Sequence, residues 1–230
     1  MSRQFAPVRA AFWLLYHPFA FAYDLVAWLV SMGTWKDWQR SALDHLPPAP
    51  ARVLDLAHGT GTLQLDLFGR GYRAIGLDFS PTMGQITRRK LRRARLPIRL
   101  TRARAQAMPF PHASFDAIIS TFPAGFIMEA DTLRECFRLL ADGGRFIIVP
   151  SAAFTGGGIV RRVLEFAYRV TGQQTGNRDD SDLNVGLAHM HAFATRLLGP
   201  HGFSVTVHHK AFPRSIAFVI VAQKQPSQTS

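Results

Sequence analysis

An apolar strand that runs directly into a glycine-rich turn constrains this chain more than any other feature. The run Arg52-Val-Leu-Asp-Leu-Ala57 predicts a short buried strand, and His58-Gly-Thr-Gly61 predicts a turn into a helix that ends near Gly69. A second strand, Tyr72 to Asp78, follows after only a few residues. This β–turn–α–β order is typical of domains built on a parallel sheet with helices on both faces.

The same alternation continues along the chain. Three further strands are expected at Ile98–Ala103, Phe115–Thr121 and Arg145–Val149. Amphipathic helices are indicated by apolar side chains that recur on one face, at Met83, Ile86, Leu91 and Ala94, and again at Leu133, Cys136, Phe137 and Leu140, before an expected helix end at Asp142-Gly143-Gly144.

Two alternating segments near the end, Phe203–Lys210 and Arg214–Val221, predict an antiparallel hairpin after a helix around Leu187–Leu198. The expected fold class is therefore α/β. It is a Rossmann-like, doubly wound, mostly parallel sheet of seven strands with a C-terminal antiparallel hairpin, preceded by an N-terminal helical lid.

The chain divides into one main domain with additions. We expect residues 1–46 to form the helical lid, residues 47–223 the α/β domain and residues 224–230 a disordered tail. Residues 151–200 depart from the alternation and predict an inserted cap, with an amphipathic helix through Ile159 to Val170 and a polar loop from Gln173 to Asp182.

The lid is apolar enough to raise the question of a membrane. Ala11–Val30 could span a bilayer by length, but Pro18 breaks a helix there and Asp24 would be costly in hydrocarbon, so two short helices are favoured. All four tryptophans precede the glycine-rich turn, at Trp13, Trp28, Trp35 and Trp38. Two readings stay open: a lid over a greasy substrate, and a helix pair that simply caps the core.

Charge and cysteine content limit the expected binding partners and cellular compartment. The formal net charge is +12, and nine basic residues with no acid between them lie from Arg88 to Arg104. This charge permits contact with anionic lipid, nucleic acid or an acidic substrate, although a solvated helix face is the favoured interpretation. Cys136 has no partner for an intrachain disulfide, and the N-terminus lacks the order of a secretory signal, so we expect a cytoplasmic protein with peripheral contact to the inner face of the membrane as an option.

The glycine-rich turn carries the strongest chemical signal. Gly59 and Gly61 let the backbone approach a ligand, and the following helix start offers N–H donors. Asp78 ends the next strand, where a carboxylate can accept both hydroxyls of a ribose. A dinucleotide site would need a third glycine where Gln64 stands, so NAD is disfavoured. S-adenosylmethionine has no phosphate, and Asp55 is a candidate partner for its ammonium group.

Longer stretches support that choice. Val53-Leu-Asp-Leu-Ala-His-Gly-Thr-Gly61 and Gly76-Leu-Asp-Phe-Ser-Pro81 resemble the first two motifs of class I S-adenosylmethionine-dependent methyltransferases. Later blocks follow in the family's order, at Ala107-Met-Pro-Phe-Pro, Ser114-Phe-Asp116, Leu133 to Gly144 and Gly202-Phe-Ser-Val. The likeness is strongest to the ubiquinone/menaquinone methyltransferase-like (methyltransferase type 11) branch. It implies S-adenosylmethionine as cofactor and a small, apolar methyl acceptor such as a quinone precursor or a lipid.

The resemblance also implies roles for individual residues. It assigns the methionine end of the cofactor to Asp55, Gly59 and Gly61, the ribose to Asp78, and the two faces of the adenine to Phe79 and Met83. The sequence departs from the family at Ala57, where glycine is usual, and at Arg104, where an aspartate usually binds the adenine amino group. The backbone of Ala105 and the side chain of Gln106 remain able to read adenine, and His58 either contacts the ligand or packs under the turn.

The catalytic group is the least determined part. Methyl transfer from a sulfonium needs alignment more than a base, and the weak candidates for proton removal are His17, Tyr23, His189 and His191. No metal site is expected. A nucleic-acid methyltransferase is the alternative enzyme, disfavoured because the Asn-Pro-Pro-aromatic tetrapeptide is missing, and a catalytically inactive binding protein is the alternative outside enzymes.

Overall fold

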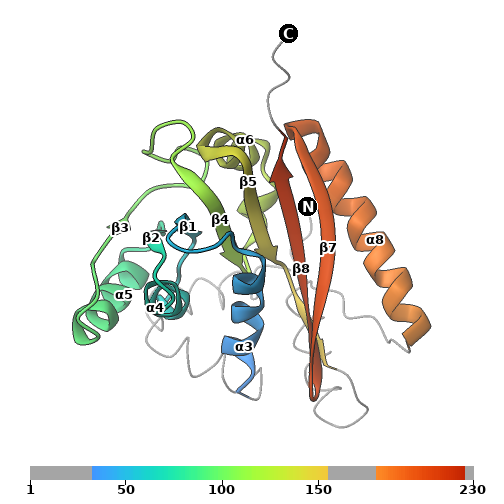
Figure 1. Cartoon of the computed structure of the whole chain (residues 1–230), viewed down its shortest axis with the longest axis horizontal. Helices are drawn as coiled ribbons and strands as arrows, with labels where there is room; N and C mark the ends of the chain where they lie inside the picture. Colours follow the sequence, from blue (N-terminus) through green and yellow to red (C-terminus); the bar gives the residue numbers. More distant parts are fainter. Residues whose placement is uncertain (1–32, 155–179, 226–230) are drawn as a thin grey trace, which may run out of the picture.

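A central mixed sheet organises the protein in the computed structural model, which describes residues 33–154 and 180–225 (Figure 1). Its strand order is β3-β2-β1-β4-β5-β8-β6, and β7 pairs with β8 off this path. The eight strands are β1 (Arg52–Leu56), β2 (Arg73–Leu77), β3 (Leu100–Thr101), β4 (Phe115–Thr121), β5 (Leu140–Val149), β6 (Ala152–Phe154), β7 (Phe203–Phe212) and β8 (Ser215–Lys224). The first five pair in parallel, and β8 runs antiparallel to its neighbours.

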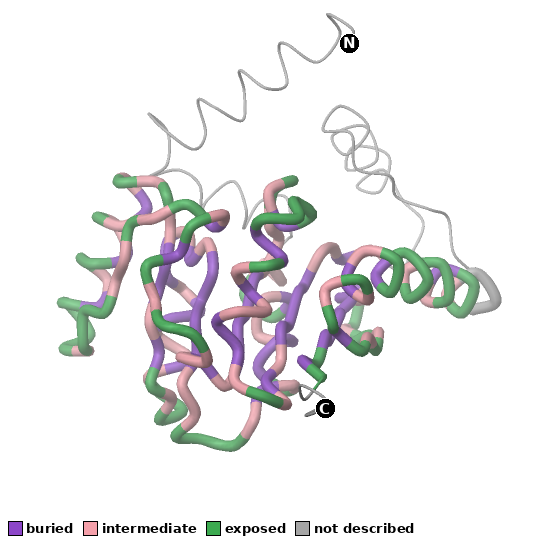
Figure 2. Tube along the Cα trace, turned by 90° about the horizontal axis from the view of Figure 1, so that it is seen from above, coloured by how far each residue is buried: buried purple, intermediate pink, exposed green. Residues whose placement is uncertain are grey.

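Helices cover both faces of this sheet (Figure 1). The 3-10 helix η3 (Ser41–His45) and α4 (Thr62–Gly69) pack with one layer of buried side chains, which includes Val53 and Ile119. Helices α6 (Ala130–Leu139) and α8 (Asp180–Leu198) pack with the other layer. The remaining elements are α3 (Trp35–Arg40), α5 (Pro81–Arg93), η4 (Gly125–Met128) and η5 (Gly199–His201). Figure 2 shows the buried positions concentrated on the strands between these helices.

The expected doubly wound fold with a C-terminal hairpin is confirmed, with eight strands instead of seven. The additional strand is β6, which pairs with the first residues of β8. Its three residues are too short to show an alternating pattern. The third strand is shorter than expected because it lies at the sheet edge, where only Leu100 and Thr101 pair, with Gly76 and Leu77 of β2.

Two helix ends differ from the expectation. Helix α6 ends at Leu139 rather than at Asp142-Gly143-Gly144, because Leu140 is already extended and pairs with Phe115 of β4. Helix α8 begins at Asp180, well before the expected Leu187 and inside the expected polar loop. On α5, Thr87 is buried and Ala94, just after the helix, is exposed, because the face between Met83 and Leu91 packs under the glycine-rich turn.

The expected boundary between the α/β domain and a disordered tail, at Lys224, is placed too early. This residue ends β8 opposite Phe203 and is 2% exposed. Its Nζ donates a hydrogen bond to the carbonyl of Leu140 at 2.9 Å and lies 4.6 Å from the centre of the Phe137 ring. A buried ammonium is tolerated here because it has these partners. Residues 226–230 lie outside the described residues.

The described part of the expected lid packs on the domain. Trp38 is 1% exposed against Ala152 and Ala217, and Ala42 and Leu43 join the core layer beside α4. Capping of the core is therefore confirmed for this part. Pro18 and the other lid residues up to 32, and the expected helix at 159–170, lie outside the described residues.

Two smaller expectations can also be compared with the structure. Cys136 is fully buried on α6, where burial raises the pKa of its thiol and favours a packing role. Among the described residues, no helix combines the length and apolar character that crossing a membrane requires.

Candidate functional site

A cavity of about 300 Å³ opens at the carboxyl ends of β1, β2 and β4. This is the edge of a parallel sheet where open α/β folds bind their ligands. Its described lining divides into two groups, which we name by the chain segments that supply them. The glycine-loop half comprises residues 56–60, 77–79, Met83 and 103–106, and the α3 half comprises Trp35, Gln39, 121–124 and Phe126.

The glycine-loop half begins with a turn in left-handed backbone conformations. Ala57, Gly59 and Gly61 have φ of 60°, 55° and 75°. The turn is tied to β2 because the Ala57 amide donates to the Leu77 carbonyl at 2.7 Å. A Cβ added at Gly61 would clash with the Thr87 side chain, whereas one at Gly59 would meet no atom of the described residues within 4 Å. Gly61 is thus required for packing, and Gly59 leaves open space in the lining.

Asp78 lies at the tip of β2 beside this turn. Its Oδ2 accepts a hydrogen bond from the Gly59 amide at 2.9 Å, and its Oδ1 accepts one from the Ser80 amide at 2.8 Å. An ionised carboxylate has about four lone-pair sites, so each oxygen retains capacity for a further donor. The carboxylate is therefore held rigidly and can still accept two hydroxyls from a ligand.

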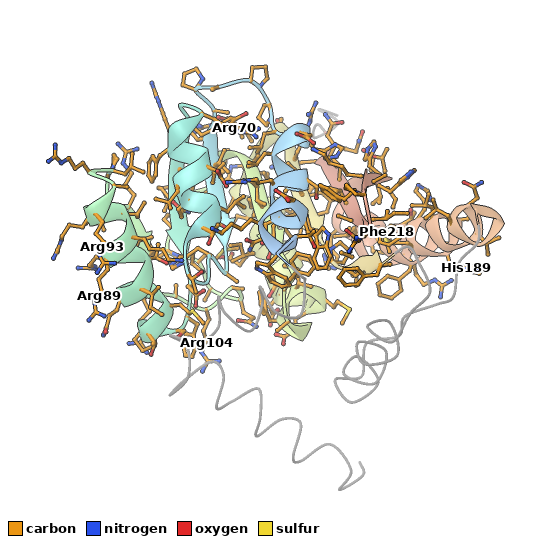
Figure 3. The ribbon with its side chains drawn as sticks, turned by 90° about the horizontal axis from the view of Figure 1, so that it is seen from below. Arg70, Arg89, Arg93, Arg104, His189 and Phe218 are labelled. Carbon is orange, nitrogen blue, oxygen red and sulfur yellow. The ribbon has the colours of Figure 1, made fainter. Side chains whose placement is uncertain are left out.

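Phe79 and Arg104 form a stacked pair at the outer edge of this half. Phe79 is 52% exposed, and the Arg104 guanidinium lies 4.7 Å from its ring centre. Arg102 donates from Nε to the Phe79 carbonyl at 3.1 Å. Figure 3 shows Arg104 at this edge, next to the basic residues of α5. The position at which the family carries an acid thus holds a cation that covers part of the aromatic face.

Asp55 and His58 lie beneath the turn. Asp55 is 2% exposed and accepts from Gln64 Nε2 at 3.1 Å, and burial raises the pKa of its carboxyl to about 6. His58 donates from Nδ1 to the Gly59 carbonyl at 2.9 Å and packs so closely on Gly76 that a Cβ there would overlap its ring. His58 packs under the turn and also lines the cavity.

The structure brings most of the expected site residues together. Eight of them line the cavity, namely Ala57, His58, Gly59, Asp78, Phe79, Met83, Ala105 and Gln106. Asp55 and Gly61 are close by but are not in the lining. His189 and His191 are exposed on α8, away from the cavity, and His191 Nε2 lies 3.1 Å from the Val205 carbonyl (Figure 3). His17 and Tyr23 lie outside the described residues.

The structure does not bring the histidines of α8 into the described lining of this cavity. Their helix packs against β7, on the antiparallel side of the sheet, whereas the cavity lies at the ends of the parallel strands. The polar side chains of the cavity's α3 half are instead Gln39 and Thr121.

The sequence analysis included Trp35 in an expected lid but gave no site role to Gln39, Thr121, Phe122 or Phe126. Trp35 stacks on Phe122 with ring centres 4.3 Å apart, and Phe126 lines the same side. Phe122 has φ of 50°, a strained conformation for a bulky residue and one that clusters at functional sites. One signal was available: Thr121 ends the fourth strand and Phe122 follows it, and the ends of parallel strands meet at one sheet edge.

The glycine-loop half fits S-adenosylmethionine chemically. It offers a rigid carboxylate acceptor at Asp78, an exposed aromatic face at Phe79, and apolar side chains at Met83 and Ala105.

In the part of the chain that the structure describes, no group of three His, Cys, Asp or Glu side chains could hold a metal ion.

Known proteins resemble this chain in sequence. Residues 53–144 match the family described as a methyltransferase domain. The demethylmenaquinone methyltransferase of Thermus thermophilus is 43% identical over 152 residues, covering 61% of this chain and 67% of that protein. The ubiquinone/menaquinone biosynthesis C-methyltransferase of Pasteurella multocida is 33% identical over 142 residues, 59% of this chain and 53% of that protein. The chain thus spans between about half and two thirds of these relatives.

Solved structures resemble it in fold. A putative S-adenosyl-L-methionine-dependent methyltransferase from Methanococcus maripaludis superposes with a TM-score of 0.61 at 19% identity, covering 92% of this chain and 94% of that one. The geranyl diphosphate C-methyltransferase of Streptomyces coelicolor gives 0.56 at 12% identity, covering 82% and 78%. The strand-tip carboxylate, the glycine-rich turn and these likenesses agree: the chain belongs to the class I S-adenosylmethionine-dependent methyltransferases, in the branch of the ubiquinone and menaquinone methyltransferases.

Proposed function

We propose that this protein transfers the methyl group of S-adenosylmethionine to a small apolar acceptor, a reduced quinone precursor. The names of the relatives from Thermus thermophilus and Pasteurella multocida support a quinone-type acceptor. The single observation that carries the proposal is the division of one cavity into a nucleoside-type half and an aromatic half. A cofactor and a flat apolar acceptor can each occupy the half that suits its chemistry.

In the glycine-loop half, each residue has a binding role. Asp78 accepts the ribose hydroxyls, while Phe79, Met83 and the backbone of Ala105 enclose the adenine. The amides of the turn that contains Gly59 meet the methionine carboxylate. Bound S-adenosylmethionine supplies an electrophilic methyl group on a sulfonium. Asp55 acts from below the turn, by holding its shape through Gln64.

In the α3 half, the protein's task is to orient the acceptor and exclude water. Its described lining residues carry no carboxylate, imidazole or amine. An in-line displacement with a good leaving group needs alignment above all, and effective molarities for well-oriented reactants are about 10⁵ M or more. The acceptor must therefore present an electron-rich atom of its own, as the ring of a hydroquinone does.

The experiment is a methyl-transfer assay with reduced demethylmenaquinone and S-adenosylmethionine. Mass spectrometry should detect a product that is heavier by one methylene. Asp78→Ala should form none, while Asp131→Ala, at an exposed position on α6, should match the wild type. A wild-type protein that binds S-adenosylhomocysteine but yields no methylated product would contradict the quinone-type acceptor.

The basic surface of α5 supports a second, finer proposal, that the protein works at the inner face of an anionic membrane. Arg88, Arg89, Arg92 and Arg93 are exposed, and Figure 3 shows Arg89 and Arg93 pointing away from the domain. Such a surface attracts anionic lipid, from which an apolar acceptor can be drawn.

Sedimentation with vesicles tests this second proposal. The protein should pellet with phosphatidylglycerol vesicles and not with phosphatidylcholine vesicles, and added salt should weaken the binding because it screens charge. Replacing Arg89 and Arg93 by glutamine should have the same effect as salt. Equal pelleting with both kinds of vesicle would contradict an electrostatic contact.

A further inference from the structure

Gln39 presents a hydrogen-bond acceptor that the described residues leave unused inside the cavity. Its Nε2 donates to Thr121 Oγ1 at 3.2 Å, and both residues line the α3 half. Its Oε1 is buried, and the described residues provide no hydrogen-bond donor for it. A buried carbonyl oxygen without a partner has lost its hydration with no hydrogen bond in return, which destabilises the protein. A ligand that supplied a donor at this point would remove that cost.

The helix that carries Gln39 is fixed on both sides of it. The Trp38 indole donates to Ser215 Oγ at 2.9 Å in a buried contact. The Arg40 guanidinium binds both carboxylate oxygens of Asp66, at 2.9 and 3.0 Å. These two anchors tie α3 to β8 and to α4, and the hydrogen bond from Nε2 to Thr121 Oγ1 holds the Gln39 amide in the lining.

Aromatic side chains line the same half of the cavity as Gln39. Trp35, one helical turn before Gln39 on α3, stacks on Phe122, the residue after Thr121. Phe126 adds a third ring to the same lining. Flat apolar surfaces next to one buried polar atom are the usual means of orienting a ring that carries a single polar substituent.

We propose that Gln39 is the specificity-determining residue for the methyl acceptor, and that it selects an aromatic ring bearing a hydroxyl that donates to Oε1. This inference rests on the proposed function and deepens it. The hydrogen-bond direction distinguishes two oxidation states of the acceptor: a hydroquinone or phenol O–H can donate to Oε1, whereas a quinone carbonyl cannot. The reduced ring is also the electron-rich one, so the residue that recognises the hydroxyl favours the reactive form.

Calorimetry with two matched probes tests the proposal on the full chain saturated with S-adenosylhomocysteine. The probes are 1-naphthol, which donates a hydrogen bond, and 1-methoxynaphthalene, which only accepts one. The wild type should bind 1-naphthol about five- to tenfold more tightly, the effect expected of one well-placed hydrogen bond. Gln39→Leu should bind the two probes with about equal affinity. The control Gln85→Leu, at an exposed position on α5, should keep the wild-type preference.

Thermal unfolding and product formation separate the alternatives. Gln39→Leu should unfold close to the wild-type temperature, because removing the unsatisfied buried oxygen offsets the loss of the hydrogen bond from Nε2 to Thr121 Oγ1. A Gln39→Leu protein that keeps the preference for 1-naphthol, or a wild type that favours the methyl ether or binds neither probe, would overturn the role of Gln39. That result would leave the proposed function standing if the wild type still methylates reduced demethylmenaquinone. A wild-type protein that does not bind S-adenosylhomocysteine would instead contradict the proposed function itself.

Discussion

The two halves of the cavity are built in different ways. The glycine-loop half comes from turns that directly follow strands β1 and β2, with Asp78 only 19 residues from Gly59, to which it is hydrogen-bonded. The α3 half joins residues that are far apart in the chain, since Gln39 and Thr121 are separated by 82 positions. One half is therefore determined by local backbone chemistry and the other by tertiary docking.

This difference explains why the halves suit different ligands. Left-handed turns and a held carboxylate offer fixed amides and acceptors, which recognise an invariant cofactor. The α3 half is made of rings and one amide held by a docked helix, and such a surface can change its acceptor by few substitutions. Variants that damage one half should therefore leave the ligand of the other half bound.

The largest effect is expected where α3 docks. Trp38→Ala should lower the free energy of unfolding by about 3–5 kcal/mol, because it empties a buried site and removes the bond to Ser215. Trp35→Ala should cost less, about 1–2 kcal/mol, because Trp35 is only half-buried and loses mainly its stack on Phe122. Urea unfolding measures both, and if Trp38→Ala is too unstable to purify, Trp38→Phe tests the loss of the indole N–H together with a smaller loss of ring volume. Equal losses for the two tryptophans would show that docking does not depend on Trp38.

The glycine-loop half allows a matched pair of substitutions. Gly61→Ala should cost about 2–5 kcal/mol, because it adds a clash with Thr87 to an unfavourable left-handed φ. Gly59→Ala carries only the conformational cost, about 1–2 kcal/mol, since in the described part of the chain no atom lies within 4 Å of its new Cβ. Urea unfolding of the two variants should rank them in this order. The reverse order would mean that the turn packs differently from the described arrangement.

Asp55 makes the stability of the glycine-loop half depend on pH. Burial raises the pKa of its carboxyl from 3.8 to about 6, so the folded state binds this proton more tightly than the unfolded chain. The stability that protonated Asp55 contributes is thus fully present below about pH 4, and it is lost as the pH rises through about 6. Asp55→Asn should remove that loss and stabilise the protein by about 1–3 kcal/mol at pH 8 relative to wild type.

Urea unfolding of wild type and Asp55→Asn between pH 5 and 8 provides the check. The gap between the two proteins should widen as pH rises, because only the wild type has to ionise a buried carboxyl. A gap that stays constant over this range would show that Asp55 titrates at its ordinary value.

The smallest effect concerns Arg104. Replacing it by aspartate should tighten the binding of S-adenosylhomocysteine about five- to tenfold, because a carboxylate there can accept from the adenine amino group and the face of Phe79 is uncovered. Calorimetry measures the change, with Arg99→Asp, at an exposed position before β3 and outside the cavity lining, as the control for the change in charge. A loss of affinity in Arg104→Asp would mean that the guanidinium itself contacts the cofactor.

Much of the fold could be predicted from local patterns. The strand, turn and helix from Arg52 to Gly69 agree with the structure almost to the residue, because apolar runs and glycines act locally. The failures came where pairing partners decide the outcome. Leu140 leaves α6 because β4 pairs with it, and Lys224 is buried because it caps the Leu140 carbonyl.

The candidate site divides in the same manner. The carboxylate of Asp78 and the turn before α4 were evident from the sequence. An acid at the end of the strand that follows a glycine-rich turn is typical of a ligand-binding position in open α/β sheets. Gln39 carried no signal, because an amide on a short helix has no pattern of its own. Only the docking of α3 against β8 and α4 brings it to Thr121.

The binding of S-adenosylhomocysteine to wild type and to Asp78→Ala is the most direct test of the central claim, that the glycine-loop half holds the cofactor. Titration calorimetry should find one site per chain in the wild type. Asp78→Ala should bind at least about 100-fold more weakly, since two hydrogen bonds to a charged acceptor are lost. Circular dichroism should show that the variant remains folded. A folded wild type that does not bind, or an Asp78→Ala variant with unchanged affinity, would contradict the account.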